Sequence, residues 1–315
     1  MIKTNKIDNQ PLVSVIMNCY NGEKYLREAI DSVYAQSYNN WEIIFWDNAS
    51  IDQSKQIANS YDSRLNYYCS KTTTSLGEAR NKALAKSNGE FIAFIDADDI
   101  WYPEKLEKQS RLFSDGIGLV YSNYNNLYSD GKEINGSIFY KFKRGNAFNQ
   151  LLENNFIVLS TAVCPKIIIE EFKGFPHYSF AEEYDLFLKI SNKYLIDYIA
   201  EPLAKYRYHE NNSTFNNFDN QINEVLEIYN YWSNTKDTII LKIINNAISY
   251  EYFALSRRCL FHLNDKNKSK YFLEKAKSTN RNISYSLFNI LLFLPMSWIL
   301  YIRKFVLGLL NWLKF

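Results

Sequence analysis

The chain has 315 residues, of which 47% are hydrophobic and 22% charged, and its formal net charge is +2 at neutral pH. This length allows one large domain with an appendage, or two domains, and the composition is that of a globular protein with a substantial core. The near-neutral charge argues against a dedicated nucleic-acid binder, which usually carries a basic stripe and a high pI.

Cysteine usage and the first residues indicate the compartment. The four cysteines lie far apart in the sequence and form no C-x-x-C pair, so we expect reduced and mostly buried thiols. Residues 1–10 are polar and contain no apolar signal segment. The sequence therefore predicts a cytoplasmic protein with a short N-terminal extension over residues 1–10.

The next hundred residues alternate between strand and helix patterns. Apolar runs of the buried-strand type and stretches of helical periodicity follow one another at 12–17 (strand), 23–36 (helix), 42–46 (strand), 52–60 (helix), 65–69 (strand), 78–86 (helix), 91–95 (strand) and from Pro103 (helix). Asp52 is expected to cap the second helix. Strands and helices in alternation, joined by short links, predict an α/β domain with a mostly parallel sheet.

Polar or acidic segments follow three of these predicted strands, at residues 18–22, 47–50 and 96–99. In open α/β sheets, ligands bind beyond the carboxyl ends of the strands. We therefore expect the three segments to converge on one site.

The acidic run Asp96-Ala97-Asp98-Asp99 is the sharpest chemical feature. Carboxylates one residue apart at a strand end can hold Mg²⁺ or Mn²⁺, which also take water and substrate phosphates as ligands. A cation there could bridge the phosphates of a nucleotide-sugar and stabilise the departing diphosphate. A lone D-x-D is also common as a solvated turn ahead of a helix, so its meaning depends on the surrounding sequence.

The surrounding sequence contains a series of motifs in a fixed order. They lie at residues 13–22, 25–26, 30–33, 36–38, 41–44, 47–50, 77, 79–81, 83 and 88–95. Together they resemble glycosyltransferase family 2. The resemblance implies the GT-A fold, in which an α/β sheet binds a nucleotide-sugar along a single continuous crevice.

The resemblance also implies roles in donor binding. Asn18, Tyr20 and Asn21 fall on the loop that packs around the donor nucleotide, and Asp47 matches the acidic residue that hydrogen-bonds its base. Arg80 stands where the family carries a donor-side arginine, with a surface salt bridge as the alternative.

The acidic run and a later motif are expected to form the metal site. Asp96 matches the carboxylate near the ribose or the metal, Asp98 matches the direct metal ligand, and Asp99 is expected to play a supporting part. The run Tyr206-Arg207-Tyr208-His209 resembles the family's YR-x-H motif. It could place Arg207 over the donor diphosphate and His209 on the metal.

An inverting transfer also needs a general base that deprotonates the acceptor hydroxyl. Residues 181–189 resemble the segment that carries this base, although Glu183 stands where aspartate is usual and Lys189 where arginine is usual. We assign Glu183 as the base, with Glu182 or Asp185 as alternatives. An ordinary acidic cluster at a helix N-terminus is the purely structural explanation.

The last part of the chain has a different composition. Residues 282–302 carry no charge and are nominally long enough to cross a bilayer, but Asn289 and Pro295 interrupt the run. Three alternatives stay open, namely apolar helices in the membrane interface flanked by basic residues, a buried hairpin, or a membrane span. Contact through residues 282–315 would place the protein at the inner face of the cytoplasmic membrane.

We predict a GT-A domain over residues 11–220 followed by a helical region over residues 221–315. The predicted reaction moves a sugar from a UDP-, GDP- or dTDP-sugar to a hydroxyl of a glycan or lipid-linked glycan, in cell-surface polysaccharide or glycoconjugate synthesis. One alternative is a catalytically inactive relative that binds or scaffolds. A sugar-nucleotide pyrophosphorylase is disfavoured, because residues 18–22 contain one glycine and no basic phosphate-binding loop.

Overall fold

The structure is a computed structural model that describes residues 10–138, 141–210, 212, 217–261, 263–280, 285, 288–290, 292–295 and 298. The chain divides into two compact units, Met1–Glu224 and Val225–Phe315. The division falls close to residue 220, where the predicted catalytic domain ends.

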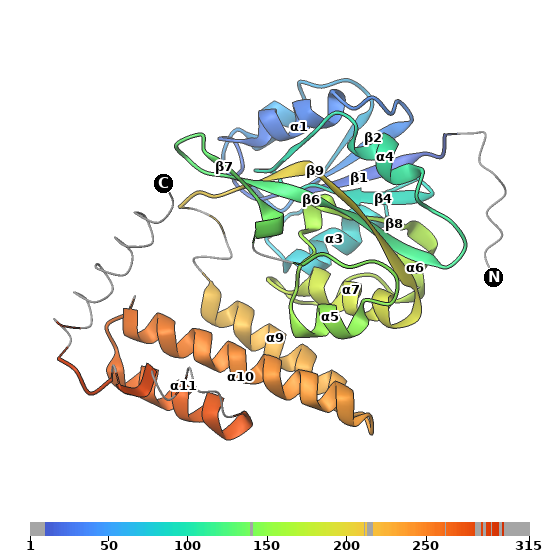
Figure 1. Ribbon diagram of the computed structural model, residues 1–315. Helices are drawn as coiled ribbons and strands as arrows, with labels where there is room; N and C mark the ends of the chain where they lie inside the picture. Colours follow the sequence, from blue (N-terminus) through green and yellow to red (C-terminus); the bar gives the residue numbers. More distant parts are fainter. Residues whose placement is uncertain are drawn as a thin grey trace. The chain divides into compact units, whose positions relative to one another are not determined.

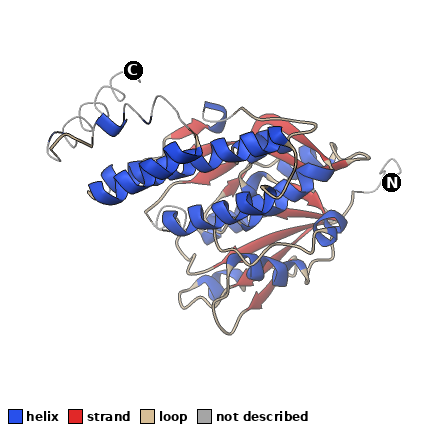
Figure 2. Ribbon diagram, turned by 90° about the horizontal axis from the view of Figure 1, so that it is seen from below, coloured by secondary structure: helices blue, strands red, loops and turns tan. Residues whose placement is uncertain are grey.

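A nine-stranded sheet organises the first unit, with its strands drawn in red in Figure 2. The strands are β1 (Val13–Cys19), β2 (Trp41–Asp47), β3 (Leu65–Cys69), β4 (Phe91–Phe94), β5 (Ile100–Trp101), β6 (Ile117–Leu127), β7 (Glu133–Asn135), β8 (Val163–Pro165) and β9 (Leu195–Arg207). Their order across the sheet is β3-β2-β1-β4-β8-β6-β9-β5, and β7 pairs with β6.

The sheet is parallel in its first part and mixed beyond it. Strands β3, β2, β1 and β4 pair in parallel, whereas β8 runs antiparallel to both β4 and β6. Strand β9 is parallel to β6 and antiparallel to β5. The predicted α/β class is confirmed, but the sheet is mixed beyond β4. Regular strand–helix alternation stops after β4, and β8 enters the sheet from far along the chain in the opposite direction.

Helices cover both faces of this sheet (Figure 1). One face carries α1 (Leu26–Tyr34), α2 (Ser54–Ala58) and α4 (Lys105–Ser110), and the other carries α3 (Leu76–Leu84), α5 (Phe148–Glu153), α6 (Lys166–Glu171) and α7 (Glu182–Lys193). Short 3₁₀ turns lie at Gly136–Ile138 and Leu159–Thr161.

The apolar face of α1 shows why the sequence folds in this way. Leu26, Ala29, Ile30 and Val33 recur at helical spacing and are fully buried. They pack in the core formed with the inward side chains of β1, β2 and β4. The predicted buried face of this helix is confirmed.

The four predicted helix starts are each wrong by two or three residues, since α1 begins at Leu26 and α3 at Leu76 rather than at residues 23 and 78. Helix α4 begins at Lys105, because Pro103 lies in the preceding turn. Helix α2 begins at Ser54, and Asp52 is not its N-cap residue. The Asp52 carboxylate instead accepts the backbone N–H groups of Ser54 and Glu23, both at 2.9 Å, so it ties the start of α2 to the loop after β1.

The second unit is helical where it is described, as the sequence predicts. Helix α9 (Phe218–Trp232) begins in the first unit, and α10 (Thr238–Phe261) and α11 (Lys266–Thr279) follow it along the chain. Helices α10 and α11 pack together around a small core to which Tyr285 and Phe288 contribute.

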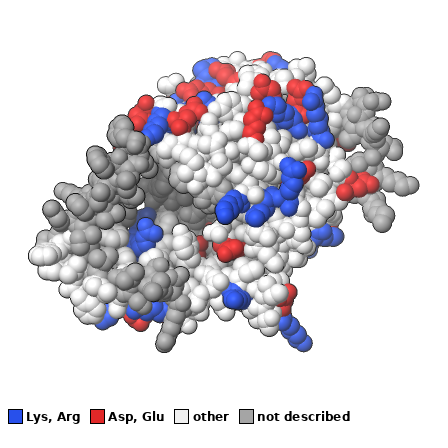
Figure 3. Space-filling model, viewed as in Figure 1, with Lys and Arg blue, Asp and Glu red and all other residues white. Residues whose placement is uncertain are grey.

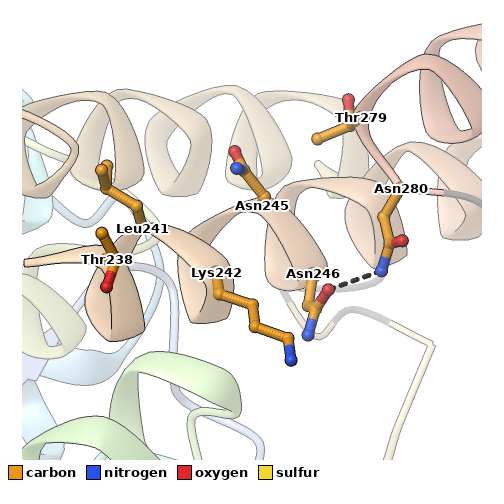
Figure 4. A pocket seen from close by; sticks show the side chains of 7 residues that line it. All are labelled: Thr238, Leu241, Lys242, Asn245, Asn246, Thr279 and Asn280. Atoms are coloured by element: carbon orange, nitrogen blue, oxygen red, sulfur yellow. Dashed lines mark hydrogen bonds between the residues drawn. The ribbon is translucent and has the colours of Figure 1, made fainter.

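A hollow of about 390 Å³ lies on the second unit near the start of α10 and the end of α11 (Figure 4). Lys242 and the amides of Asn245, Asn246 and Asn280 line it, and Asn280 donates to Asn246 at 2.5 Å. It contains none of the predicted site residues.

Most of the predicted membrane-contacting segment, residues 282–315, lies outside the described residues. Of the helices that the structure does describe, none is both long and apolar enough to cross a bilayer. On the face drawn in Figure 3, basic and acidic side chains of the described residues are interspersed rather than gathered into a basic stripe.

Candidate active site

The three polar loops meet at one edge of the sheet. Strands β1 and β2 pair in register, with Cys19 opposite Asp47, so the loops that follow them start side by side. Asn21 joins these loops, because its N–H donates to Ser50 Oγ and its Oδ1 accepts from Ile51 N, both at 2.9 Å. A Cβ placed on Gly22 would lie 3.5 Å from Ala97 Cβ, so the acidic loop is also close.

Asp99 anchors the acidic loop from within. Its side chain is buried and accepts Ser160 Oγ at 2.5 Å and the backbone N–H of Arg207 at 3.0 Å. Ser160 Oγ also receives the N–H of Asp96 at 3.1 Å. Burial raises the pKa of Asp99 well above its ordinary value, and the neighbouring charges of Asp98 and Asp96 add to the rise. Asp99 therefore supports the loop.

Asp98 lies against His209. Asp98 Oδ2 is 2.9 Å from His209 Nε2, and the Asp98 side chain remains 30% exposed. The ring of Tyr25 packs on His209 with centroids 4.8 Å apart, and His209 N donates to Asn212 Oδ1 at 2.6 Å. The predicted metal ligand and the predicted histidine are thus brought together from residues more than a hundred positions apart.

The side chains around Asp98 fit a hard divalent cation whose coordination shell is completed by substrate. Among the described residues no group of three or more His, Cys, Asp or Glu side chains forms a closed metal cage. Mg²⁺ and Mn²⁺ sites that serve nucleotide phosphates need only one or two carboxylates from the protein. Asp98, partly exposed and next to an imidazole, meets that requirement.

Arg207 holds the end of β9 to the acidic loop. Its Nε donates to the carbonyl oxygen of Asp98 at 2.8 Å, and its Nη2 pairs with Glu28 at 2.5 Å. The guanidinium also lies over the ring of Tyr25, 4.5 Å from the centroid. These contacts fix the loop that carries Asp98.

Arg80 is the buried centre of an ion-pair network. Only 3% of Arg80 is exposed, so the alternative of a surface salt bridge is wrong. Its Nη2 lies 3.2 Å from Asp96 Oδ1, and its Nη1 lies 3.7 Å from Glu183 Oε2 and in direct contact with Glu182. One guanidinium thereby connects the acidic loop to the start of α7.

The surplus of carboxylates around Arg80 affects their ionisation. Burial raises the pKa of Glu183, Arg80 opposes this rise, and the negative charges of Asp96 and Glu224 add to it. Burial likewise raises the pKa of Asp96, against the influence of Arg80 and with that of Asp98. A carboxylate with a raised pKa is a better proton acceptor than an ordinary one.

The three acidic residues at the start of α7 have different surroundings. The Glu182 side chain is fully buried against Arg80. Asp185 is 7% exposed and pairs with Lys189 at 2.5 Å. The Glu183 side chain remains 21% exposed, so of the three it has the greatest access to an acceptor.

The segment leading into α7 is held by residues of α3 that belong to the predicted motif. Asn81 exchanges two hydrogen bonds with the backbone of Phe175, both at 2.8 Å. Gly77 N donates to Tyr178 O at 2.9 Å, and a Cβ on Gly77 would lie 1.8 Å from Pro176 O. Gly77 is therefore required by close backbone approach.

The residues assigned to the donor lie on the first two loops. Asn18, at the end of β1, has a buried side-chain amide with no hydrogen-bond partner among the described residues. Tyr20 is 57% exposed. Asp47 is buried and accepts Ser50 N at 2.7 Å and Tyr67 Oη at 2.8 Å, so both of its oxygens already have partners within the chain.

Sequence reasoning missed three residues that support the site. Ser160 holds the acidic loop, Glu28 pairs with Arg207, and Glu224 contacts the segment before α7. None lies in a recognisable motif at the right position, and each acts on residues far away in the sequence. Glu28 lies between two of the motifs, and its contact with Arg207 depends on β9, which comes much later in the chain.

Comparison with known proteins identifies the family. A family model described as Glycosyl transferase family 2 matches residues 14–171. Escherichia coli WfgD, a UDP-Glc:alpha-D-GlcNAc-diphosphoundecaprenol beta-1,3-glucosyltransferase, is 34% identical over 213 residues that cover 66% of this chain and 81% of WfgD. The chain belongs to glycosyltransferase family 2.

Solved structures show the same fold. TarS of S. aureus in complex with UDP-GlcNAc superposes with a TM-score of 0.66 at 19% identity, over 85% of this chain and 81% of the TarS chain. The mannosyltransferase PcManGT from Pyrobaculum calidifontis, in complex with GDP-Man and Mn²⁺, gives a TM-score of 0.63 at 19% identity, over 95% of this chain and 86% of PcManGT. The predicted GT-A fold is confirmed.

Proposed function

We propose that this family 2 glycosyltransferase is metal-dependent and transfers its sugar with inversion, with Glu183 as the base. The observation that carries the proposal is the position of Arg80, which contacts Asp96 on the acidic loop and Glu183 at the start of α7. The Arg80 guanidinium thus holds a donor-side and an acceptor-side carboxylate. An in-line displacement needs a base and a leaving-group site that flank the same anomeric carbon.

The proposed reaction is a single displacement. The acceptor hydroxyl oxygen forms a bond to the anomeric carbon while the bond from that carbon to the diphosphate breaks. The hydroxyl proton passes to the Glu183 carboxylate, and the nucleoside diphosphate leaves with the bonding electron pair. The partial exposure of Glu183 and its raised pKa support this role over Glu182 and Asp185, whose side chains are buried and paired.

Asp98, with His209 and Asp96 beside it, would hold Mg²⁺ or Mn²⁺. When bound, such an ion neutralises charge that develops on the departing diphosphate. Arg207 and Asp99 contribute by fixing the loop on which Asp98 lies. The presence of Mn²⁺ in the PcManGT complex supports the proposal of a divalent cation.

The donor is a UDP-, GDP- or dTDP-sugar bound at the loops after β1 and β2. The amide of Asn18, buried and unpartnered among the described residues, offers both a donor and an acceptor to a ligand. Exposed Tyr20 offers an aromatic face beside it. Asn21 and Asp47 hold the two loops in place through hydrogen bonds to the backbone of residues 50 and 51.

We propose a lipid-linked glycan acceptor at the inner face of the cytoplasmic membrane, in cell-surface polysaccharide synthesis. The relative WfgD carries a diphosphoundecaprenol-linked acceptor in its name, which supports this class. Residues 282–315 would contact the bilayer. Of the described residues in this segment, Ile290, Phe293 and Trp298 are 60%, 78% and 65% exposed, as interfacial anchors would be.

The test is a screen of UDP-, GDP- and dTDP-sugars for release of nucleoside diphosphate, with membrane lipid extract as acceptor. We expect release from one donor with Mg²⁺ or Mn²⁺, its loss with EDTA, and its loss in Asp98→Ala. The matched control is Asp130→Ala, which removes an exposed turn carboxylate. Release that survives both EDTA and Asp98→Ala would refute the metal assignment, and no release from any donor would favour an inactive scaffold.

A further inference from the structure

Glu224, near the start of α9, holds the backbone just before the proposed base. Its Oε1 accepts the N–H of Ser179 at 2.9 Å, and its Oε2 accepts those of Phe180 and Ala181 at 2.8 and 3.0 Å. One carboxylate therefore binds three consecutive backbone N–H groups. Hydrogen bonds to an ionised acceptor are shorter and stronger than neutral ones.

These three N–H groups lead directly into the helix that carries the base. Ala181 is the N-cap residue of α7 and has no side-chain cap, and Glu182 and Glu183 are the first two residues of the helix. Backbone N–H groups at a helix start lack partners within the helix. Glu224 supplies an anionic partner from another helix, where the helix dipole also favours negative charge.

Helix α3 holds a neighbouring stretch of the same segment. Asn81 binds the backbone of Phe175, and Gly77 binds that of Tyr178. Arg80 then pairs with Glu182 and Glu183. The contacts from α3 stop at Tyr178 and resume at Glu182, and Glu224 binds the three residues between them.

We propose that Glu224 is a positioning residue for the catalytic base, which fixes the backbone from which Glu183 projects and places a negative charge near it. The inference rests on the proposed function, because it assumes that Glu183 is the base. Glu224 does not itself touch the reacting atoms.

Both effects of Glu224 are open to measurement. The charged groups facing Glu183 are Arg80 from α3, Asp96 from the acidic loop, Glu224 from α9 and its own neighbour Glu182. The charge of Glu224 acts to raise the pKa of Glu183. Removing that charge is expected to move the acid limb of kcat to lower pH, which loss of backbone support alone would not do.

The first experiment is amide hydrogen exchange over residues 174–190 in the full-length protein, which needs no ligand. We compare Glu224→Gln and Glu224→Ala with Glu227→Gln, which makes the same chemical change at an exposed position on the same helix. Exchange at residues 179–181 is expected to rise in both Glu224 variants and to match wild type in Glu227→Gln. Unchanged exchange in Glu224→Ala would overturn the proposal.

The second experiment measures kcat and KM with the donor that the wild-type protein turns over. We expect kcat to fall on the order of 10- to 100-fold in Glu224→Ala, since misplacing a catalytic group by about 1 Å has that effect. The KM for the donor is expected to stay near the wild-type value, because Glu224 contacts no donor loop. Glu224→Gln is expected to lose less activity and to show the shifted acid limb.

The outcomes separate this inference from the function on which it rests. If Glu183→Gln abolishes transfer while both Glu224 variants keep the wild-type kcat and pH profile, the positioning role is wrong and the function stands. If Glu183→Gln retains full activity, the assignment of the base fails, whatever the exchange data show. A parallel loss of kcat and donor affinity in Glu224→Gln would indicate a general structural role and overturn the proposal.

Discussion

Three carboxylates lie within four residues at the start of α7, and their different surroundings suit them to different roles. Glu182 is buried against Arg80, and Asp185 is buried against Lys189. Glu183 combines a looser contact with Arg80 at 3.7 Å and a partly exposed side chain. A base must be both accessible to the acceptor and free to take a proton, so Glu183 suits that part best.

The pH dependence of turnover tests this assignment. Because burial raises the pKa of Glu183 from its ordinary 4.5, the ionised base is lost at a higher pH than for a free glutamate. We expect the acid limb of kcat to lie above pH 4.5 and Glu183→Gln to lower kcat by about 10²- to 10⁴-fold. Asp185→Asn, which breaks the ion pair with Lys189, is expected to leave the acid limb of kcat at the wild-type pH. A limb that persists in Glu183→Gln would contradict the assignment.

At the scale of residues, the sequence predicts best the side chains that lie in motifs. Asp98 and His209 were expected near one another and lie 2.9 Å apart. Arg80 was expected on the donor side, and its guanidinium lies among three carboxylates, one of which is Asp96 on the acidic loop. Its contact with the donor stays a prediction. Ser160 and Glu224 could not be predicted, because their contacts join distant segments and have no local pattern.

At the scale of elements, helix α3 explains why its motif contains a glycine, an arginine and an asparagine. Gly77 lets the backbone of residues 176–178 approach, Arg80 binds the acids of α7, and Asn81 pairs with the backbone of Phe175. A short helix thereby fixes a segment almost a hundred residues further along the chain.

Substitution of Gly77 by alanine tests this docking, because the sign of the change in the free energy of unfolding depends on it. Gly→Ala within a helix ordinarily stabilises a protein by about 0.5–1 kcal/mol. At this position the new Cβ would lie 1.8 Å from Pro176 O, so we expect Gly77→Ala to lower the free energy of unfolding by about 1–3 kcal/mol. Denaturant unfolding followed by circular dichroism measures the change. A stabilised variant would contradict the docking of residues 176–178 on α3.

Secondary structure was predictable where its period was regular. The strand at residues 65–69 is confirmed at both ends, and α1 has the predicted buried face. Beyond β4 the alternation stops, so the antiparallel entry of β8 could not be read from local periodicity. Helix starts moved by a few residues where a turn competed, as at Pro103 and Asp52.

At the scale of the whole molecule, the site is assembled from distant parts of the first unit. The family match ends at residue 171, whereas Glu183, Arg207 and His209 come later in the chain. These later residues reach the site because β9 pairs in parallel with β6 within the sheet and α7 packs on α3. The matched part holds the acidic loop, and the later part brings the proposed base and the histidine to it.

The central claim is a single displacement with Glu183 as base, and product stereochemistry tests it most directly. The measurement is ¹H NMR of the anomeric coupling in the product, made with the donor found by the screen. The account predicts a product whose anomeric configuration is opposite to that of the donor. The residual product of Glu183→Gln is expected to have the same configuration as the wild-type product. A product that retains the donor's configuration would contradict a single displacement and the role assigned to Glu183.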